Sequence, residues 1–291
     1  MTRILLTGKT GQVGYELERS LQGLGEIIAL DRSQMDLANL DQVRDVIRSI
    51  KPNLIINSAA YTAVDKAESE PELAMRINGE APGVMAEEAK KLGAAMIHYS
   101  TDYVFDGSKS TRYVETDPTC PINVYGATKL AGEQAIRSAG IPHLILRTSW
   151  VYGMRGNNFL RTILRLAQER DELRIVADQH GAPTWCRTIA DTTVHIIAQS
   201  KCAQLGQEWW QERSGIYHLT AQGQTTWYGF TQAILENATI VKKPVLAPIA
   251  TQDYPLPAKR PTNSAVSSEK LISVFCRLPN WEAALKLCIR Q

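Results

Sequence analysis

The chain has 291 residues, of which 44% are hydrophobic, so it is long enough for one large globular domain or two smaller ones. Lysine and arginine number 32 against 30 aspartates and glutamates, and the net charge of +2 does not favour nucleic acid or an anionic membrane as a partner. No apolar run approaches the roughly 18 residues of a membrane span, and the five cysteines show no metal-ligand spacing. These features predict a cytoplasmic protein with reduced thiols.

Short apolar runs alternate with amphipathic stretches through the first half of the chain. The runs read "RILLTG", "EIIALD", "NLIINSAA", "AAMIHYS" and "HLILRTSWVYG". Continuous apolar strands separated by helices are typical of a parallel sheet that is covered on both faces. We therefore predict an α/β fold with a doubly wound parallel sheet of the Rossmann type, forming a dinucleotide-binding domain over residues 1–153.

After residue 153 the alternation weakens. We expect a helix over 159–170, an extended stretch "LRIVADQHGAPT", a helix over 188–199, and a polar tail whose prolines exclude a continuous helix. Residues 154–291 are predicted to form mainly a smaller C-terminal substrate-binding lobe, with segments that can return to the first domain. The stretch "LGQEWWQERSG" is expected to be a loop, and it suggests no role.

A glycine-rich loop follows the first predicted strand. The segment "ILLTGKTGQVG" places Gly8, Gly11 and Gly14 between a strand and a helix, where glycines permit a tight turn and let backbone amides approach a pyrophosphate. All three are candidate cofactor residues. The spacing is G-x-x-G-x-x-G, and glycines also end strands for steric reasons alone, so that explanation stays open.

The segment "LDRS" ends the second predicted strand and bears on the choice of cofactor. Asp31, about 20 residues after the middle glycine, can hold the ribose 2′-hydroxyl of NADH, whereas Arg32 can pair with the 2′-phosphate of NADPH. We predict that both cofactors are used, with some preference for NADPH. Asp36 and Leu37 are candidates for contact with the adenine, although Asp36 is equally suited to be the N-cap of the helix expected near residue 40.

Tyr125 and Lys129 lie four residues apart in a predicted helix and therefore share one face. An ammonium group near a phenol favours the phenolate and lowers the pKa of the tyrosine. This pair alone recurs by chance in many helices. Ser100 and Thr101 end the preceding strand, where a hydroxyl can hold a carbonyl oxygen while Tyr125 gives that oxygen a proton. Together the motifs predict a site for hydride transfer.

In this order of motifs the chain resembles the extended short-chain dehydrogenase/reductase family, and within it the reductases of dTDP-linked 4-keto-6-deoxy sugars. The similarity extends along nearly the whole chain through "GKTGQVG", "AYTAVDKAE", "STDYVFDG", "YGATKLAGE", "RTSWVYG", "DQHGAPT" and "RPTNS". It implies reduction of the C4 keto group of dTDP-4-dehydro-L-rhamnose by hydride transfer from NADPH or NADH, in the synthesis of cell-surface polysaccharide. It also implies Thr101 as hydroxyl partner, Tyr125 as proton donor and Lys129 as ligand of the nicotinamide ribose.

Further binding residues follow from the same resemblance. It implies cofactor contacts at Gly11, Gln12, Val13, Asp31, Asp36, Leu37, Ala60, Tyr61 and Thr62, and sugar contacts at Asp102 and Trp150. Trp150 offers a flat apolar wall, although a tryptophan beside a strand end is as often part of a core. Arg260 is a candidate for binding the diphosphate, or else a solvated surface residue.

Two other functions stay open, one catalytic and one non-catalytic. Related 4,6-dehydratases carry an Asp-Glu pair after the threonine, whereas here Asp102 is followed by Tyr103. Without the second carboxylate there is no evident base for a carbon-bound proton, so reduction is favoured over dehydration or epimerisation. A non-catalytic subunit is the second alternative, since a regulator of methionine adenosyltransferase is similar to this family. The intact Thr101, Tyr125 and Lys129 argue against it.

Members of the resembled family hold magnesium with acidic residues at a dimer contact. Glu16 matches one such position, but Arg187 stands where an acid would be expected, and a guanidinium supplies no oxygen ligand. We therefore predict no bound metal, and a homodimer stays a hypothesis.

Overall fold

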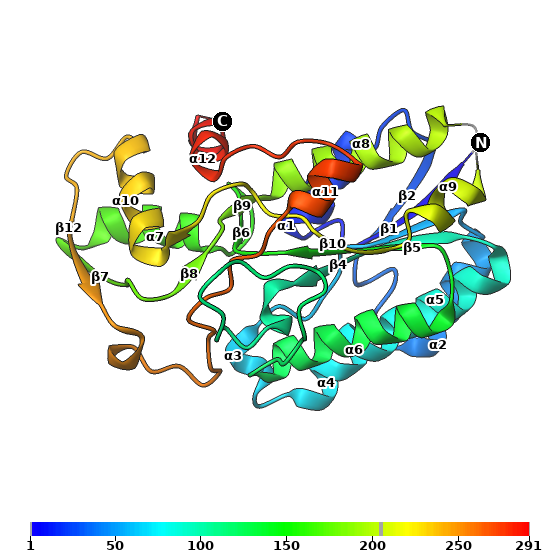
Figure 1. Ribbon diagram of the computed structural model, residues 1–291, viewed down its shortest axis with the longest axis horizontal. Helices are drawn as coiled ribbons and strands as arrows, with labels where there is room; N and C mark the ends of the chain where they lie inside the picture. Colours follow the sequence, from blue (N-terminus) through cyan, green and yellow to red (C-terminus); the bar gives the residue numbers. More distant parts are fainter. Residues whose placement is uncertain (1, 204–205, 291) are drawn as a thin grey trace.

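The computed structural model describes residues 2–203 and 206–290. Its larger part is a sheet of six parallel strands in the order β10-β5-β4-β3-β1-β2 (Figure 1). The strands are β1 (Arg3–Thr7), β2 (Glu26–Leu30), β3 (Leu54–Asn57), β4 (Ala95–Thr101), β5 (His143–Thr148) and β10 (Gly215–His218). The doubly wound parallel sheet predicted from the apolar runs is confirmed.

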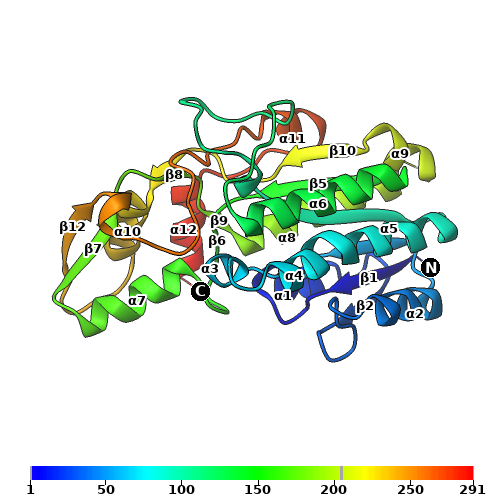
Figure 2. The same ribbon diagram turned by 90° about the horizontal axis from the view of Figure 1, so that it is seen from below.

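Helices cover both faces of this sheet. Successive side chains of a strand point to opposite faces, so apolar strands present an apolar surface on each side. Ile4 and Leu6 pack in one core and Leu5 in the other. The first face carries α1 (Gln12–Ser20), α8 (Cys186–Cys202), α9 (Gln207–Glu212) and α11 (Glu269–Val274). The second face carries α2 (Leu40–Ile50), α5 (Ala81–Leu92) and α6 (Val124–Ala139), of which α5 and α6 lie in front of the sheet in Figure 2.

A smaller group of elements lies beyond the carboxyl ends of the strands (Figure 1). It has its own core, which includes Tyr152, Leu160, Trp185, Phe230 and Leu285. Its helices are α7 (Phe159–Glu169), α10 (Trp227–Asn237) and α12 (Trp281–Ile289). Its short strands are β6 (Val151–Tyr152), β7 (Glu172–Val176), β8 (His180–Gly181), β9 (Thr184–Trp185), β11 (Thr225–Thr226) and β12 (Val245–Ile249), paired β6 with β9, β7 with β12 and β8 with β11.

Short helical segments connect the main elements. They are α3 (Val64–Ala67), α4 (Pro71–Met75), the π-helix η1 (Arg76–Glu80) and the 3₁₀ turns η2 (Asp102–Val104) and η3 (Thr251–Asp253). The helix expected over 159–170 is confirmed as α7, and the helix expected over 188–199 is longer at both ends as α8. None of the helices in the described part of the chain is both long and apolar enough to cross a membrane.

The stretch around Trp209 and Trp210 is helix α9, and our expectation of a loop there was wrong. Trp209 is 2% exposed and its ring lies 6.0 Å from that of Phe275, within the core on the first face of the sheet. The Arg213 guanidinium lies 4.8 Å from the same ring. Trp210 also packs against this core, so the two tryptophans anchor the helix to the sheet.

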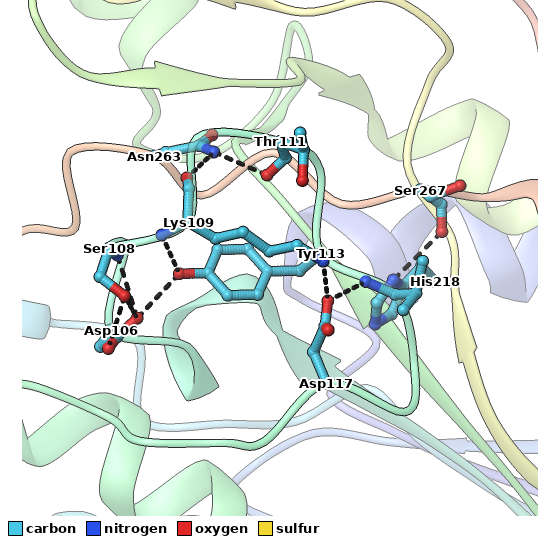
Figure 3. A network of polar contacts seen from close by, with 10 residues as sticks. Asp106, Ser108, Lys109, Thr111, Tyr113, Asp117, His218, Asn263 and Ser267 are labelled. Atoms are coloured by element: carbon cyan, nitrogen blue, oxygen red, sulfur yellow. Dashed lines mark hydrogen bonds and ion pairs between the residues drawn. The ribbon is translucent and has the colours of Figure 1, made fainter.

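A network of polar contacts ties the loop after η2 to a segment near the C-terminus (Figure 3). The Tyr113 hydroxyl donates to Asp106 Oδ1 at 2.8 Å, and Asn263 Nδ2 donates to the carbonyls of Lys109 and Thr111 at 2.7 and 3.0 Å. The Thr262 hydroxyl also donates to the carbonyl of Gly107 at 3.0 Å, so the motifs "STDYVFDG" and "RPTNS" lie side by side, although they are far apart in the sequence.

Candidate active site

The glycine loop lies where the strand order reverses, between β1 and β3. Gly8 has a φ of +73°, and a Cβ at this residue would come within 3.0 Å of the Ala59 backbone. A Cβ at Gly14, in the first turns of α1, would lie 2.1 Å from the Gly8 carbonyl oxygen. The lack of space for a Cβ thus accounts for both glycines. The glycine loop borders the crevice at which doubly wound sheets bind their ligands.

A cavity of about 530 Å³ opens at this loop, within the size range of small-molecule sites. It is lined by most of the predicted cofactor residues, namely Gly8, Gly11, Gln12, Val13, Asp31, Arg32, Asp36, Leu37, Ala60, Tyr61, Thr62, Tyr125 and Lys129. Gly14 does not line it, because its place is in the packing of α1 on the loop.

Asp31 and Arg32 are both engaged within the chain. Asp31 Oδ1 accepts from the backbone N and the hydroxyl of Ser33 at 2.9 and 2.6 Å, and Lys9 Nζ lies 3.5 Å from Oδ2. The Ser33 hydroxyl, with help from Lys9, lowers the pKa of Asp31, which favours the carboxylate. Arg32 is largely exposed and lies 3.5 Å from Asp36. Lys9 was not predicted from the sequence, in which it stands only as a basic residue inside the glycine loop.

The alternative role of Asp36 as a helix N-cap was wrong. Helix α2 is capped by Asn39, whose Oδ1 accepts from the backbone N of Gln42 at 3.0 Å. Asp36 Oδ1 instead accepts from the backbone N of Ala38 at 3.0 Å, and the residue lines the cavity. A residue three positions nearer to the helix took the capping role because it has the extended backbone that an N-cap requires.

Asn78 joins the end of β3 to helix α6. Its Oδ1 accepts from the backbone N of Tyr61 at 2.8 Å, and its Nδ2 donates to the carbonyl of Tyr61 at 3.0 Å and to Thr128 Oγ1 at 3.2 Å. Asn78 lies in the π-helix η1, a distortion that is frequent at functional sites. The sequence carried no signal for it, since one asparagine in an amphipathic stretch has no distinguishing pattern.

Tyr125 and Lys129 share one face of α6, and both line the cavity together with Ser100. The helix begins after Asn123, whose Oδ1 accepts from the backbone N of Gly126 at 2.8 Å. Burial raises the pKa of Tyr125 to about 12, and the nearby Thr101 side chain partly opposes the shift. The phenol therefore keeps its proton at neutral pH, as a proton donor must.

Lys129 is 2% exposed and turns toward β4. Its Nζ donates to the carbonyl of Tyr99 at 2.6 Å and lies 3.3 Å from His98 Nε2. Burial lowers the pKa of Lys129 to about 8. The predicted lowering of the Tyr125 pKa by Lys129 is not what this structure shows, because desolvation is the largest effect on the phenol and the Asp102 carboxylate also raises the pKa.

Thr101 and Asp102 lie next to the cavity without lining it. The Asp102 carboxylate accepts from Thr101 Oγ1 at 3.0 Å and from Ser149 Oγ at 2.8 Å, and it is 3% exposed. Burial raises its pKa to about 6. The rings of Tyr103 and Tyr125 meet edge to face with centroids 5.9 Å apart.

A second cavity of about 610 Å³ lies on the far side of Tyr103. Its lining includes Tyr103, Phe159, Arg174, Gln179, Trp227, Lys259 and Arg260. Because Tyr103 lines this cavity and Tyr125 lines the first, the two cavities adjoin across that aromatic pair. Arg174, Lys259 and Arg260 give the second cavity three cationic side chains, which suit an anionic ligand.

Arg260 is not a solvated surface residue, so that alternative was wrong. Its side chain is 14% exposed, and its Nη1 and Nη2 donate to Asp65 Oδ1 and Oδ2 at 3.0 and 2.7 Å. Trp150 has a φ of +45°, and its ring stacks on Trp227 with centroids 3.5 Å apart and planes 5° apart. Of this stacked pair, Trp227 lines the second cavity and Trp150 lies behind it.

Arg187, which stands where an acidic metal ligand would be expected, forms two ion pairs. Its Nη1 lies 3.6 Å from Glu16 and its Nε 3.6 Å from Asp191. Within residues 2–203 and 206–290, no three or more His, Cys, Asp or Glu side chains are grouped as metal ligands. The guanidinium occupies the space between the two carboxylates.

Comparison with known proteins gives matches over the full chain. The family model described as the RmlD substrate binding domain matches residues 1–291. A dTDP-4-dehydrorhamnose reductase from Burkholderia thailandensis is 49% identical over 99% of this chain and 98% of that protein. A solved dTDP-4-dehydrorhamnose reductase from Clostridium acetobutylicum is 35% identical, with a TM-score of 0.90 over 99% of both chains. One from Bacillus anthracis, solved in complex with NADP, is 34% identical, with a TM-score of 0.88 over 100% of this chain and 99% of that one.

Proposed function

The chain belongs to the family of the RmlD substrate binding domain, that of the dTDP-4-dehydrorhamnose reductases, and we propose that it reduces the C4 keto group of dTDP-4-dehydro-L-rhamnose to give dTDP-L-rhamnose. The observation that carries this proposal is the first cavity, where the glycine loop and the Tyr125 and Lys129 pair face one space. A site that both binds a dinucleotide and offers a phenolic proton beside it suits reduction of a carbonyl.

The first cavity fits a dinucleotide. Gly8 lines the cavity and leaves no room for a Cβ beside the Ala59 backbone, and the N-terminus of α1 would point its free backbone amides at a pyrophosphate bound there. Asp31 and Arg32 would hold the adenosine ribose. Asp36 and Leu37 would contact the adenine, and Ala60, Tyr61 and Thr62 would contact the cofactor where it passes the end of β3. When bound there, NAD(P)H supplies the hydride.

Tyr125 is proposed to protonate the C4 oxygen. Its raised pKa keeps the phenol protonated at neutral pH, so it can hydrogen bond to the carbonyl oxygen and give up its proton as negative charge develops. Thr101 would supply a second hydrogen bond to the same oxygen by turning its one hydroxyl hydrogen away from Asp102, which accepts it in this structure. Lys129 would bind the nicotinamide ribose from the same helix face.

The second cavity is proposed to hold the dTDP part of the substrate. Arg174, Lys259 and Arg260 would face the diphosphate, and Trp227, backed by Trp150, offers a flat wall. The sugar would then reach across Tyr103 toward Tyr125. Asp102 is proposed to contact the sugar, because its carboxylate loses the Thr101 hydrogen bond when that hydroxyl turns to the C4 oxygen. In this scheme residues 154–291 are mainly the substrate-binding lobe.

Reduction is favoured over the alternatives by the residue after Asp102. Tyr103 is half-buried, and removal of water from its hydroxyl raises its pKa well above the ordinary value, so it cannot act as the carboxylate base that a dehydratase needs. We also propose that the protein works in the cytoplasm, in keeping with its five free cysteines. A homodimer is a hypothesis that sedimentation of the purified chain tests.

The proposal is tested by incubating the purified protein with NADPH and dTDP-4-dehydro-L-rhamnose. We expect one NADPH to be oxidised for each molecule of product formed, and the product to be identified by mass and NMR as dTDP-L-rhamnose. An epimerised or dehydrated product, or consumption of no cofactor, would contradict it.

A further inference from the structure

A buried chain of hydrogen bonds leads from Lys129 to the end of β1, and no part of the proposed mechanism uses it. His98 on β4, Asn57 on β3 and Thr7 on β1 lie side by side in register, with exposures of 0%, 1% and 2%. Polar side chains at such positions are costly unless each finds a partner. The partners that they find determine where the protons lie.

Thr7 fixes the orientation of the Asn57 amide. The Thr7 hydroxyl oxygen accepts from the backbone N of Ala59 at 3.3 Å, and the hydroxyl donates to Asn57 Oδ1 at 2.7 Å. The other end of the amide, Asn57 Nδ2, lies 3.1 Å from His98 Nδ1. An amide nitrogen can only donate, so His98 Nδ1 must accept.

The orientation of Asn57 in turn fixes the tautomer of His98. A neutral imidazole that accepts at Nδ1 carries its proton on Nε2. Burial holds the pKa of His98 well below its usual range, so the ring is neutral. Its Nε2–H therefore points at Lys129 Nζ, 3.3 Å away.

An ammonium group at Lys129 would face this N–H with another donor, because it has three N–H bonds and no acceptor. The neutral amine has a lone pair that can accept from Nε2–H while one of its hydrogens is donated to the Tyr99 carbonyl. We propose that His98 is a positioning residue that selects the neutral amine of Lys129 over its ammonium form. The inference rests on the proposed function only for the role of Lys129 in holding the cofactor.

The other groups around this pair do not remove the preference. Glu133, one turn further along α6, favours the ammonium, but its carboxylate is neutralised by Arg147 on β5. The Tyr99 hydroxyl is turned away to Thr193, and Tyr125 is uncharged at neutral pH. Burial acts on Lys129 in the same direction as His98 and brings its pKa to about 8. Lys129 should therefore change charge within the range where enzymes work, and cofactor affinity should change with it.

The tautomer is read directly by ¹⁵N NMR of the full chain labelled at histidine. The His98 signals are identified by their loss in His98→Gln, with His143→Gln as a matched control at a histidine remote from Lys129. We expect the Nε2–H form of His98 between about pH 6 and 9. We also expect a perturbation of both ring nitrogens as Lys129 titrates, which disappears in Lys129→Met. An Nδ1–H tautomer or an imidazolium would overturn the proposal.

The consequence for Lys129 is read from the dissociation constant of NADH as a function of pH. NADH is the probe because it lacks the titrating 2′-phosphate. In His98→Gln the glutamine can offer its Oε1 as acceptor to the Lys129 ammonium. The pH midpoint of the Lys129-dependent change in NADH affinity should therefore rise by at least about one pH unit, which is a tenfold change in proton affinity. A merely structural role would weaken binding equally at all pH values, and that result would overturn the proposal. Both measurements stand without turnover, so a failed reductase assay and a failed inference remain distinguishable.

Discussion

The Glu133 carboxylate and the Arg147 guanidinium form a two-point ion pair inside the protein. Arg147 Nε lies 2.9 Å from Glu133 Oε1, and Arg147 Nη2 lies 2.7 Å from Glu133 Oε2. The side chain of Glu133 is 1% exposed and that of Arg147 is 2% exposed. The Ser100 hydroxyl donates to the same Oε1 at 2.5 Å. One carboxylate thus joins α6, which carries Tyr125 and Lys129, to the ends of β4 and β5.

Removing this carboxylate charge should destabilise the protein. We expect Glu133→Gln to lower the free energy of unfolding by about 3 to 5 kcal/mol, because it leaves the Arg147 charge buried without its partner. Denaturant unfolding measures the change. The matched control is Glu169→Gln, which breaks an exposed pair with Arg165 and should cost less than about 1 kcal/mol. Equal losses in the two variants would show that the buried pair has no special weight.

The choice of cofactor should respond to two adjacent side chains in opposite ways. Arg32→Ala should weaken use of NADPH selectively, because it removes a partner of the 2′-phosphate, and Asp31→Ala should weaken use of NADH. The measurement is kcat/KM for both cofactors in the wild type and both variants. We expect a wild-type preference for NADPH below about 1,000-fold, since Asp31 repels the phosphate that Arg32 attracts. Variants that affect both cofactors equally would refute the assignment.

Activity should not depend on a metal ion. Arg187 places a guanidinium against Glu16 and Asp191, and a guanidinium cannot act as a ligand of a hard cation. Turnover should therefore be unchanged after treatment with EDTA and gel filtration. Loss of activity together with dissociation of an oligomer, both restored by magnesium, would prove this prediction wrong.

Lys129 should matter for both turnover and binding. We expect Lys129→Ala to lower kcat and to raise the dissociation constant of NADPH, because the proposal gives this side chain the nicotinamide ribose as well as a place beside Tyr125. Fluorescence titration of NADPH measures the second effect, with the exposed Lys91→Ala as control. An unchanged dissociation constant in the Lys129 variant would remove the ribose from its role.

The sheet and the first cavity could be predicted because their signals are local. Apolar strands between helices indicate the doubly wound order, and Gly8, Asp31 and Tyr125 each stand beside a strand end or on a helix face that the sequence reveals. The residues that were missed act through partners far along the chain. Lys9 meets Asp31 only after β1 and β2 pair, and Asn78 meets Tyr61 through a π-helix that no periodicity indicates. His98 looked like one more residue of a buried strand, and only the folded sheet shows that Asn57 and Lys129 face its two nitrogens.

The burial that sets the pKa of Tyr125 was likewise beyond the sequence. The spacing to Lys129 predicted a lowered value, whereas desolvation in the folded protein raises it to about 12. The pattern of residues gives the neighbours of a group, but only the folded chain gives the amount of water removed from it.

The most direct test of the account is the turnover of Tyr125→Phe with NADPH and dTDP-4-dehydro-L-rhamnose. We predict that kcat falls at least about 100-fold, as is typical when a general acid is lost, while the dissociation constant of NADPH changes little. Tyr103→Phe, which keeps the ring against Tyr125, serves as the comparison and should lower kcat far less than Tyr125→Phe does. Turnover of Tyr125→Phe close to that of the wild type would contradict the central claim that this phenol protonates the sugar oxygen.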